Sequence, residues 1–460
     1  MADMHAREWR SRRWQGKHDV RLEWNRVGPT PSPCEPRAGK GATGLDGAFV
    51  FRGAFPPFRK DERETRTVSR CTRWQADVKL LMALAGRTSG GVPEPGDDLE
   101  PKTAPATSLR GRGAADNPTN RFESIHLEPL DSDEDWNPED HVAPRTQFFR
   151  DATQTFITFN KSPDLGFGAG INPYRGCEHG CIYCFARPTH EYLGFSAGLD
   201  FESRIMVKED GPALLRRELS AQKWQPQVIT MSGVTDCYQP VERRFGLTRR
   251  CLEVLAEFRN PVAIITKNHL VTRDVDLLSE LARHQAAMVN ISITTLDASL
   301  TPKLEPRASL PAHRLAAVRL LTDAGIPVNV MVAPIIPGIT DHEVPAILAA
   351  VAAAGAVSAA YVPLRLPWGV APLFEDWLTR HFPDRKEKVL NRIRAMRGGK
   401  LNDPNFGTRM TGEGIFAEQM AKMFEVASRR AGLPKGEIHL STAAFRRPAG
   451  KQMEMFQEEG

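Results

Sequence analysis

Long hydrophobic runs are absent from this sequence, and cysteine is scarce. No apolar stretch reaches the ~18 residues that a membrane-spanning helix requires, and the N-terminus lacks the apolar segment of a secretory signal peptide. Only 7 of the 460 residues are cysteine, and three of them stand close together, which indicates a reducing compartment rather than a disulfide framework. We therefore expect a cytoplasmic protein that does not bind a membrane.

A strong excess of positive charge is also missing from most of the chain. The formal net charge is +5, but residues 1–75 hold 16 Lys and Arg against 9 Asp and Glu, whereas the remainder holds 45 against 47. A dedicated nucleic-acid-binding domain is usually strongly basic. Nucleic-acid binding by the main part of this chain would therefore depend on a local basic patch.

Apolar periodicity is nearly absent from the first part of the chain. Residues 1–107 combine tryptophan and arginine with stretches such as VGPTPSPCEP and SGGVPEPGDD. Such a composition buries too little apolar surface to offset the entropy of folding. We predict a disordered N-terminal extension, or a start codon assigned too far upstream. Residues 108–165 are expected to wrap the domain that follows.

From residue 166 onward, short apolar runs alternate with amphipathic stretches. Strands separated by helices pair in parallel through right-handed crossovers, so the fold class is α/β. Six units are fewer than the eight of a closed barrel. Periodicity alone does not distinguish a partial (β/α)6 barrel over residues 166–383 from a doubly wound open sheet. The expected strands are 169–174, 227–233, 262–267, 288–294, 328–334 and 358–364, and the expected helices are 212–222, 243–258, 274–284, 312–324, 342–354 and 372–381.

Residues 384–460 are predicted to form a helical extension, with a helix at 413–430 and a short strand at 437–445. Its basic stretch 385–400 has one acid, Glu387, and seven cations: Arg385, Lys386, Lys388, Arg392, Arg394, Arg397 and Lys400. Arg385, Lys388 and Arg392 follow helical spacings of three and four, so they share one face. That face either contacts the phosphates of a nucleic acid or is solvated, with Val389 and Ile393 turned to the barrel.

Three cysteines form the most informative motif. Cys177, Cys181 and Cys184 follow the spacing C-x3-C-x2-C in INPYRGCEHGCIYCFARPTH. Thiolates at such spacing can hold three irons of a [4Fe–4S] cluster and leave one iron open. One alternative is a zinc site with His179 or His190 as fourth ligand, but structural zinc sites usually use two separated ligand pairs. Another alternative is three core or redox cysteines without a metal.

The motif, with Tyr183 just before its last cysteine, resembles that of the radical SAM superfamily. Further segments are similar to its DNA repair photolyase-like branch, which is related to spore photoproduct lyase. They are GVTDCYQPVE (233–242), ITKN (265–268), NISITTLD (290–297), EPR (305–307) and APIIPGITD (333–341). The resemblance implies a six-unit partial barrel, a [4Fe–4S] cluster and S-adenosylmethionine (SAM). It also implies an electron donor such as flavodoxin or ferredoxin.

The activity that this resemblance implies is reductive cleavage of SAM. An electron from the cluster splits SAM into methionine and a 5′-deoxyadenosyl radical, which takes a hydrogen atom from the substrate. The sequence does not name that substrate, and nucleic acid is one candidate class. The alternative from another class of function is a non-catalytic metal-cluster or zinc-binding scaffold, or a redox sensor.

Active sites of parallel α/β folds lie at the C-terminal ends of the strands, and the motifs fall there. The resemblance implies a set of SAM-binding residues: Tyr183, Thr235, Asp236, Lys267, Ser292 and Arg307. Lys267 can bind the SAM carboxylate, and Arg307 either shares that role or pairs with Glu305. Tyr183 either covers the adenine or fills the barrel mouth. Lys267 could instead be a solvated surface lysine, and the hydroxyl residues could be ordinary strand residues.

Cys237 has two interpretations. Spore photoproduct lyase has a hydrogen-donating cysteine near the end of the corresponding strand. In this chain Gly233 stands at that place, and Cys237 comes slightly later. Cys237 is therefore either a catalytic hydrogen donor beside SAM or a small buried cysteine of the core.

Deletion of residues 1–105 is expected to leave folding and SAM cleavage nearly intact, because this segment lacks apolar periodicity. Thermal unfolding and formation of 5′-deoxyadenosine would be compared between the truncated and full-length proteins. A truncated protein that aggregates or does not retain its cluster would contradict the predicted disorder.

Overall fold

The computed structural model describes residues 109–122, 144–433 and 438–448. The predicted disordered extension, residues 1–107, lies outside these ranges. Within them, no helix combines the length and the apolar character needed to cross a bilayer.

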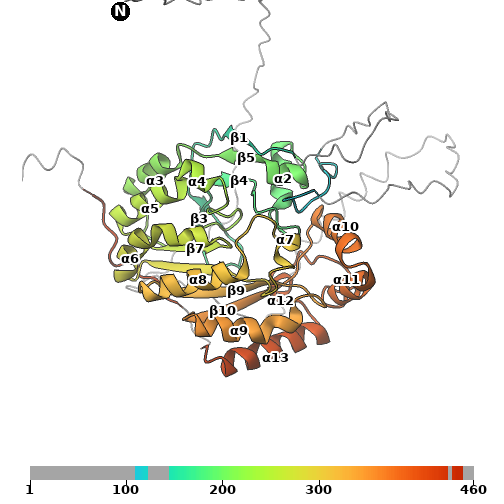
Figure 1. The fold of residues 1–460 in the computed structure, drawn as a ribbon. Coiled ribbons are helices and arrows are strands. Elements are labelled where there is room, and N and C mark those ends of the chain that lie inside the picture. Colours follow the sequence, from blue (N-terminus) through green and yellow to red (C-terminus); the bar gives the residue numbers. More distant parts are fainter. Residues whose placement is uncertain (1–108, 123–143, 434–437, 449–460) are drawn as a thin grey trace, which may run out of the picture. The chain divides into compact units, whose positions relative to one another are not determined.

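A seven-stranded sheet has the order β10-β9-β8-β7-β6-β3-β2 (Figure 1). Its neighbours from β3 to β10 pair in parallel, and β2 pairs antiparallel with β3. The strands are β2 (Thr158–Phe159), β3 (Ala169–Ile171), β6 (Ile229–Met231), β7 (Val262–Thr266), β8 (Ala287–Ser292), β9 (Val328–Ile335) and β10 (Ser358–Pro363). In the described residues β10 does not pair with β3. The predicted α/β class and six parallel strands are confirmed, as an open arrangement rather than a closed barrel.

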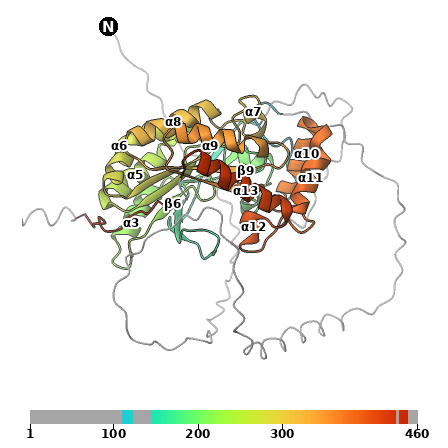
Figure 2. The same cartoon turned by 90° about the horizontal axis from the view of Figure 1, so that it is seen from below.

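Helices connect the parallel strands and pack on one face of the sheet. Because side chains alternate across a strand, Ile229, Ile264, Val289 and Val330 share one large apolar core with these helices. Figure 2 shows the helices following one another along the sheet. They are α3 (Gly211–Ser220), α4 (Glu242–Phe245), α5 (Leu247–Phe258), α6 (Val275–Arg283), α8 (Pro311–Asp323) and α9 (Val344–Ala353). A further helix, α10 (Val370–His381), follows β10 and packs in a separate apolar cluster.

Shorter elements lie between them, and a second sheet has the order β1-β5-β4. The strands of that sheet are β1 (Gln147–Arg150), β4 (Tyr174–Arg175) and β5 (Arg204–Val207). The short helices are η2 (Arg187–Thr189), η3 (Glu191–Leu193), α2 (Leu199–Ser203), η4 (His269–Asp274), α7 (Thr301–Leu304), η5 (Asp341–Glu343) and η6 (Pro383–Arg385).

Three predicted elements differ from the structure. The helix expected at 243–258 is divided into α4 and α5, because Gly246 takes a left-handed φ of 60° that ends a helix. The strand expected at 169–174 is divided between β3 and β4, which belong to different sheets. The strand expected at 437–445 is absent from its described part, 438–445. Leu440 packs there in an apolar cluster with Met288.

The C-terminal extension contains α11 (Lys386–Ala395), α12 (Thr408–Thr411) and α13 (Ile415–Arg430). Val389 and Ile393 are buried with α10 in one apolar cluster, as expected for a helix that packs on the domain. Of the predicted basic face, Lys388 and Arg392 lie on α11, and Arg385 is the residue immediately before it. Arg385 belongs to η6, and Arg392 pairs with Asp341 at 3.1 Å.

Candidate functional site

The three cysteines lie on the loop that follows β3 and β4. Cys177 and Cys181 are each 7% exposed, and Cys184 is partly buried. Gly176 and Gly180 take left-handed φ angles of 78° and 65°, which glycine adopts without steric cost. The Cys184 N–H donates to the carbonyl oxygen of Cys181 at 3.1 Å. These turns collect three thiols on one short segment.

A buried arginine holds this loop in place. Arg187 donates to the carbonyl oxygens of Gly180 (3.2 Å) and Cys181 (3.0 Å) and to the Glu202 carboxylate (2.5 Å). Two further carbonyl oxygens, of residues 197 and 198, accept from the same guanidinium. The side chains of Arg187 and Glu202 are both 0% exposed. Sequence reasoning missed this pair, because the motif shows only the cysteines and not what supports them.

The segment 112–114 packs against the same loop. The N–H groups of Gly113 and Ala114 donate to Glu202 at 3.0 and 2.9 Å. A Cβ built on Gly113 would lie 1.9 Å from the carbonyl oxygen of Gly180. Only glycine therefore fits at this position, and the approach joins the N-terminal segment to the cysteine loop.

The cysteines and nearby histidines could bind either zinc or an iron–sulfur cluster. Among the described residues, no three His, Cys, Asp or Glu side chains converge closely enough for one metal ion. His179 contacts Asp236 through Nδ1 (3.3 Å) and Asn268 through Nε2 (3.2 Å). His190 lies beside Phe195, and its Nε2 is buried without a hydrogen-bond partner among the described residues. A [4Fe–4S] cluster requires no such convergence, because each thiolate binds a different iron, and both ring nitrogens of His179 are engaged within the protein.

Burial raises the pKa of all three thiols. The Glu305 carboxylate raises the pKa of Cys181 further, whereas the Lys267 ammonium lowers the pKa of Cys181 and of Cys184. Metal-bound cysteines are thiolates. Lys267 is therefore a cation close enough to this loop to favour the thiolate form.

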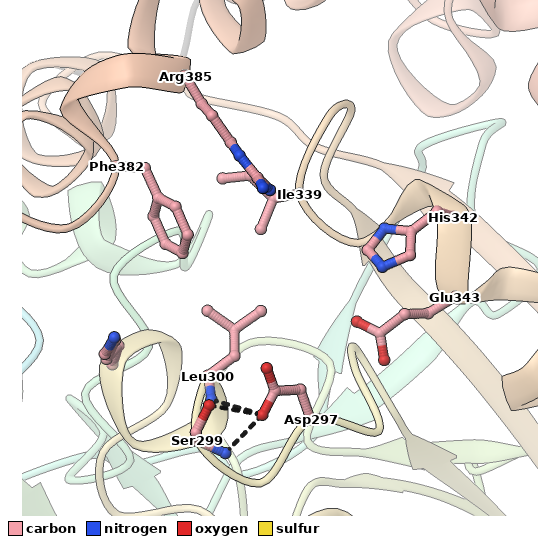
Figure 3. Close-up of a pocket in the computed structure, with 9 residues that line it drawn as sticks. Asp297, Ser299, Leu300, Ile339, His342, Glu343, Phe382 and Arg385 are labelled. Carbon is pink, nitrogen blue, oxygen red and sulfur yellow. Dashed lines mark hydrogen bonds between the residues drawn. The ribbon is translucent and has the colours of Figure 1, made fainter.

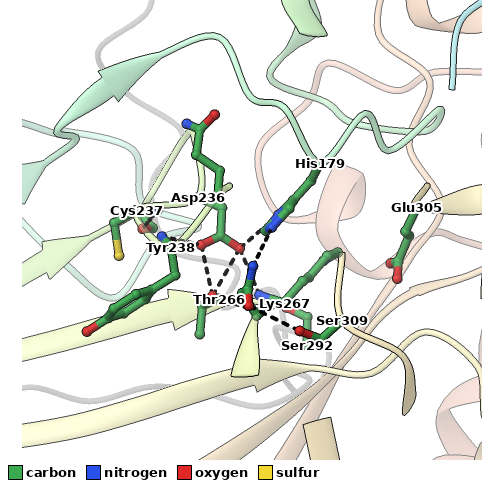
Figure 4. A network of polar contacts seen from close by, with 12 residues as sticks. His179, Asp236, Cys237, Tyr238, Thr266, Lys267, Ser292, Glu305 and Ser309 are labelled. Atoms are coloured by element: carbon green, nitrogen blue, oxygen red, sulfur yellow. Dashed lines mark hydrogen bonds and ion pairs between the residues drawn. The ribbon is translucent and has the colours of Figure 1, made fainter. Parts of the chain in front are cut away.

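Asp236 and Lys267 meet at the C-terminal edge of β6 and β7 (Figure 4). The Asp236 carboxylate accepts from the Lys267 N–H and the Thr266 hydroxyl, both at 2.8 Å. Burial by itself raises the pKa of Asp236, but His179 and these hydrogen bonds hold it below its usual range. The Lys267 ammonium lies 6.0 Å from the centroid of the Tyr183 ring. The expected neighbours Tyr183, Asp236 and Lys267 are therefore brought together.

Glu305 lies at the centre of a second buried network. Its carboxylate accepts from the Tyr183 hydroxyl, from Thr294 (2.9 Å) and from Arg314. Burial by itself raises the pKa of Glu305, but Arg314 and Lys267 lower it to about 2. Arg314 also donates to the carbonyl oxygen of Ser292 at 3.0 Å. Sequence reasoning did not single out Arg314, because nothing in its helical surroundings marks it.

Thr235 and Arg307, two further predicted SAM-binding residues, have hydrogen-bond partners within the protein. The Thr235 hydroxyl donates to the carbonyl oxygen of Tyr174 at 2.7 Å. Arg307 pairs with Glu178 at 3.1 Å and donates to Thr146 at 3.3 Å. The alternative pairing of Arg307 with Glu305 is wrong, since Arg314 occupies that carboxylate.

Cys237 lies in the main apolar core. The residue is 0% exposed, and its N–H donates to the Ser232 hydroxyl at 2.7 Å. Burial raises the pKa of its thiol well above the ordinary value. This environment is typical of a structural cysteine.

Sequence comparison identifies the family. The model of the radical SAM superfamily matches residues 171–351. An uncharacterized protein of Mycobacterium tuberculosis is 37% identical over 253 residues, which cover 54% of this chain and 73% of that protein. An uncharacterized protein of Methanocaldococcus jannaschii is 32% identical over 173 residues, covering 38% and 62%. The chain belongs to the radical SAM superfamily, as its motifs predicted.

Comparison with solved structures found similar chains at low identity. A mutant of spore photoproduct lyase has a TM-score of 0.44 and 18% identity, covering 62% of this chain and 77% of that chain. SuiB of Streptococcus suis, bound to S-adenosylmethionine, has a TM-score of 0.33 and 15% identity, covering 46% and 48%.

The substitution Gly113→Ala is expected to destabilise the protein by about 1–3 kcal/mol, as overpacking does, because the new methyl group would overlap the Gly180 carbonyl. Urea unfolding measures the change. Gly369→Ala is the matched control, since its Cβ would meet only Ala197 at an ordinary 3.5 Å. Equal stability of the two variants would mean that the contact between segment 112–114 and the cysteine loop is not formed.

Proposed function

We propose that this protein is a radical SAM enzyme in which Cys177, Cys181 and Cys184 hold a [4Fe–4S] cluster. The observation that carries the proposal is the cysteine triplet on one loop, with Lys267 close enough to lower the pKa of Cys181 and of Cys184. When bound, the reduced cluster supplies the electron that splits SAM into methionine and a 5′-deoxyadenosyl radical, which takes a hydrogen atom from the substrate.

The chain's own residues bind and orient SAM in this proposal. The Lys267 ammonium neutralises the SAM carboxylate through a charge-assisted hydrogen bond. Tyr183 covers the adenine, with its hydroxyl held by Glu305 and Thr294. Ser292, the last residue of β8, offers a hydroxyl to the polar groups of SAM.

Three of the expected SAM-binding residues take positioning roles in this proposal. Asp236 orients the backbone of Lys267, Thr235 fixes the loop after β6 to the carbonyl oxygen of Tyr174, and Arg307 neutralises Glu178. Each of these contacts is made within the protein and fixes the position of the residue. Cys237 has no catalytic role in the proposal, because its thiol is enclosed by the core.

An electron must reach the cluster, and we propose a small one-electron carrier such as flavodoxin or ferredoxin as its source. The side of the loop at Cys184 reaches the surface, because Cys184 is partly buried and Phe185 is 51% exposed. Electron entry at this surface requires no opening of the core.

Nucleic acid is the substrate class that the likeness to spore photoproduct lyase suggests. The basic residues of the C-terminal extension offer limited support. Arg392 is paired with Asp341, and Arg397 is 5% exposed and donates to backbone carbonyl oxygens. The proposed function therefore comprises the reaction type and the cofactors, and nucleic-acid binding would be measured directly.

The variant Cys181→Ala is expected to lose the four-iron absorbance spectrum after anaerobic reconstitution, because one of three iron ligands is removed. Formation of 5′-deoxyadenosine from SAM with dithionite should fall to background. Cys251→Ala is the control, since Cys251 is buried in α5 and lies in the apolar core.

Two results would contradict this assignment. A full four-iron cluster in Cys181→Ala would require another ligand. A wild-type cluster that never yields 5′-deoxyadenosine would favour the alternative of a non-catalytic scaffold or redox sensor.

The variant Lys267→Gln is expected to keep its cluster and to bind SAM about 10-fold or more weakly, because a hydrogen bond to a charged group is lost. Calorimetric titration of SAM into the reconstituted protein measures this change. Lys223→Gln, at an exposed lysine after α3, should bind SAM as the wild type does. Unchanged SAM affinity in Lys267→Gln would exclude Lys267 as the partner of the carboxylate.

A further inference from the structure

A pocket of about 570 Å³ lies beyond the C-terminal ends of β8 and β9 (Figure 3). None of the residues proposed to hold the cluster or to contact SAM lines it. Its volume falls within the range of about 300–1,000 Å³ that is usual for small-molecule sites. The pocket is therefore large enough for a ligand of its own.

Three cationic or hydrogen-bond-donating side chains from separate segments line this pocket. They are Lys303 of α7, His342 of η5 and Arg385 of η6. Figure 3 shows the Arg385 side chain extending into the pocket from one side and the His342 ring on another. Neither Lys303 nor Arg385 forms an ion pair with another residue in the described parts of the chain. No carboxylate of the described residues therefore lies within ion-pair distance of either charge.

Two carboxylates also line the pocket, but both are used by the loop after β8. Glu343 accepts from the Thr295 hydroxyl (2.6 Å) and the Leu296 N–H (2.7 Å). One oxygen of Asp297 accepts from the N–H and the hydroxyl of Ser299, each at 2.7 Å. Glu343 therefore uses both oxygens in the loop, whereas Asp297 uses one. Hydrogen bonds from Ser299 and, to a smaller extent, the Lys303 ammonium lower the pKa of Asp297, although no ion pair forms.

The remaining pocket wall is apolar, and it packs against α10. Leu300, Ile339 and Phe382 line the pocket beside the cations. The Phe382 ring packs against Trp377 with centroids 5.4 Å apart, and the Trp377 Nε1–H donates to the carbonyl oxygen of Lys303 at 2.9 Å. The cationic and apolar walls are thus tied to each other through α10.

We propose that this pocket binds a small organic phosphate monoester. A terminal phosphate has three oxygens and carries up to two negative charges, which suits donors that come from three directions. Arg385 and Lys303 bind these oxygens, and the organic part lies on the wall formed by Leu300, Ile339 and Phe382. The inference does not rest on the proposed radical chemistry, because the pocket shares no residue with the cysteine loop.

The test uses phenyl phosphate as the probe, with the reconstituted full-length protein and isothermal titration calorimetry. Phenol serves as the probe without phosphate, and an oligothymidylate without terminal phosphates represents a phosphodiester strand. The pocket variant combines Lys303→Gln with Arg385→Gln. Its matched control combines Lys388→Gln with Lys400→Gln, which removes two exposed cations that do not line the pocket.

The wild type should bind phenyl phosphate at least about tenfold more tightly than phenol, and the pocket variant should lose about tenfold or more in affinity. The control should stay within about twofold of the wild type. All substituted side chains are exposed, so the variants should unfold at the wild-type temperature.

The proposal is overturned if the wild type does not bind phenyl phosphate, or if the pocket and control variants lose affinity equally. Equal binding of phenol would mean that the phosphate is not recognised. Binding of the oligothymidylate without binding of phenyl phosphate would assign the cations to a nucleic-acid strand instead.

Discussion

The Arg187 guanidinium is fully buried, and hydrogen bonds engage its three nitrogens inside the protein. A buried charge is unfavourable unless it is paired and hydrogen-bonded, and Glu202 supplies the opposite charge. The four carbonyl oxygens that complete the set belong to the cysteine loop and to the turn before α2. The position of Cys181 thus depends on an ion pair that lies behind the loop rather than on the cysteines themselves.

Charged groups with partners inside the protein also lie at the C-terminal edge of the main sheet. Asp236 and Glu305 are buried carboxylates, and the positive or donating groups around each hold its pKa below the usual range. Lys267 links them, since its backbone N–H binds Asp236 and its ammonium lowers the pKa of Glu305. These two ionised acids lie beside a cation that lowers the pKa of Cys181 and of Cys184. A carboxylate-bearing cofactor placed there would meet a positive charge already in position.

Much of the fold could be predicted because its signals are local. Each parallel strand is a short apolar run, and the helices between them show apolar residues at helical spacing. The predicted bounds of helices and strands were wrong where a single residue ended an element or where a strand paired with a distant segment. Gly246 divides a continuous amphipathic stretch into two helices. The run around Tyr174 is apolar enough to extend β3, yet β4 pairs with β5 in the second sheet.

The sequence by itself determined the cysteine triplet, the six β/α units and the membership of the radical SAM superfamily, because each is a pattern of neighbouring residues. Only the tertiary structure decided that Glu305 pairs with Arg314 and that Arg307 pairs with Glu178. It also decided that Arg392 pairs with Asp341, a carboxylate 51 residues away in the chain. Buried polar groups take whichever partner the packing brings within reach, and residues far apart in the chain carry no local mark of that choice.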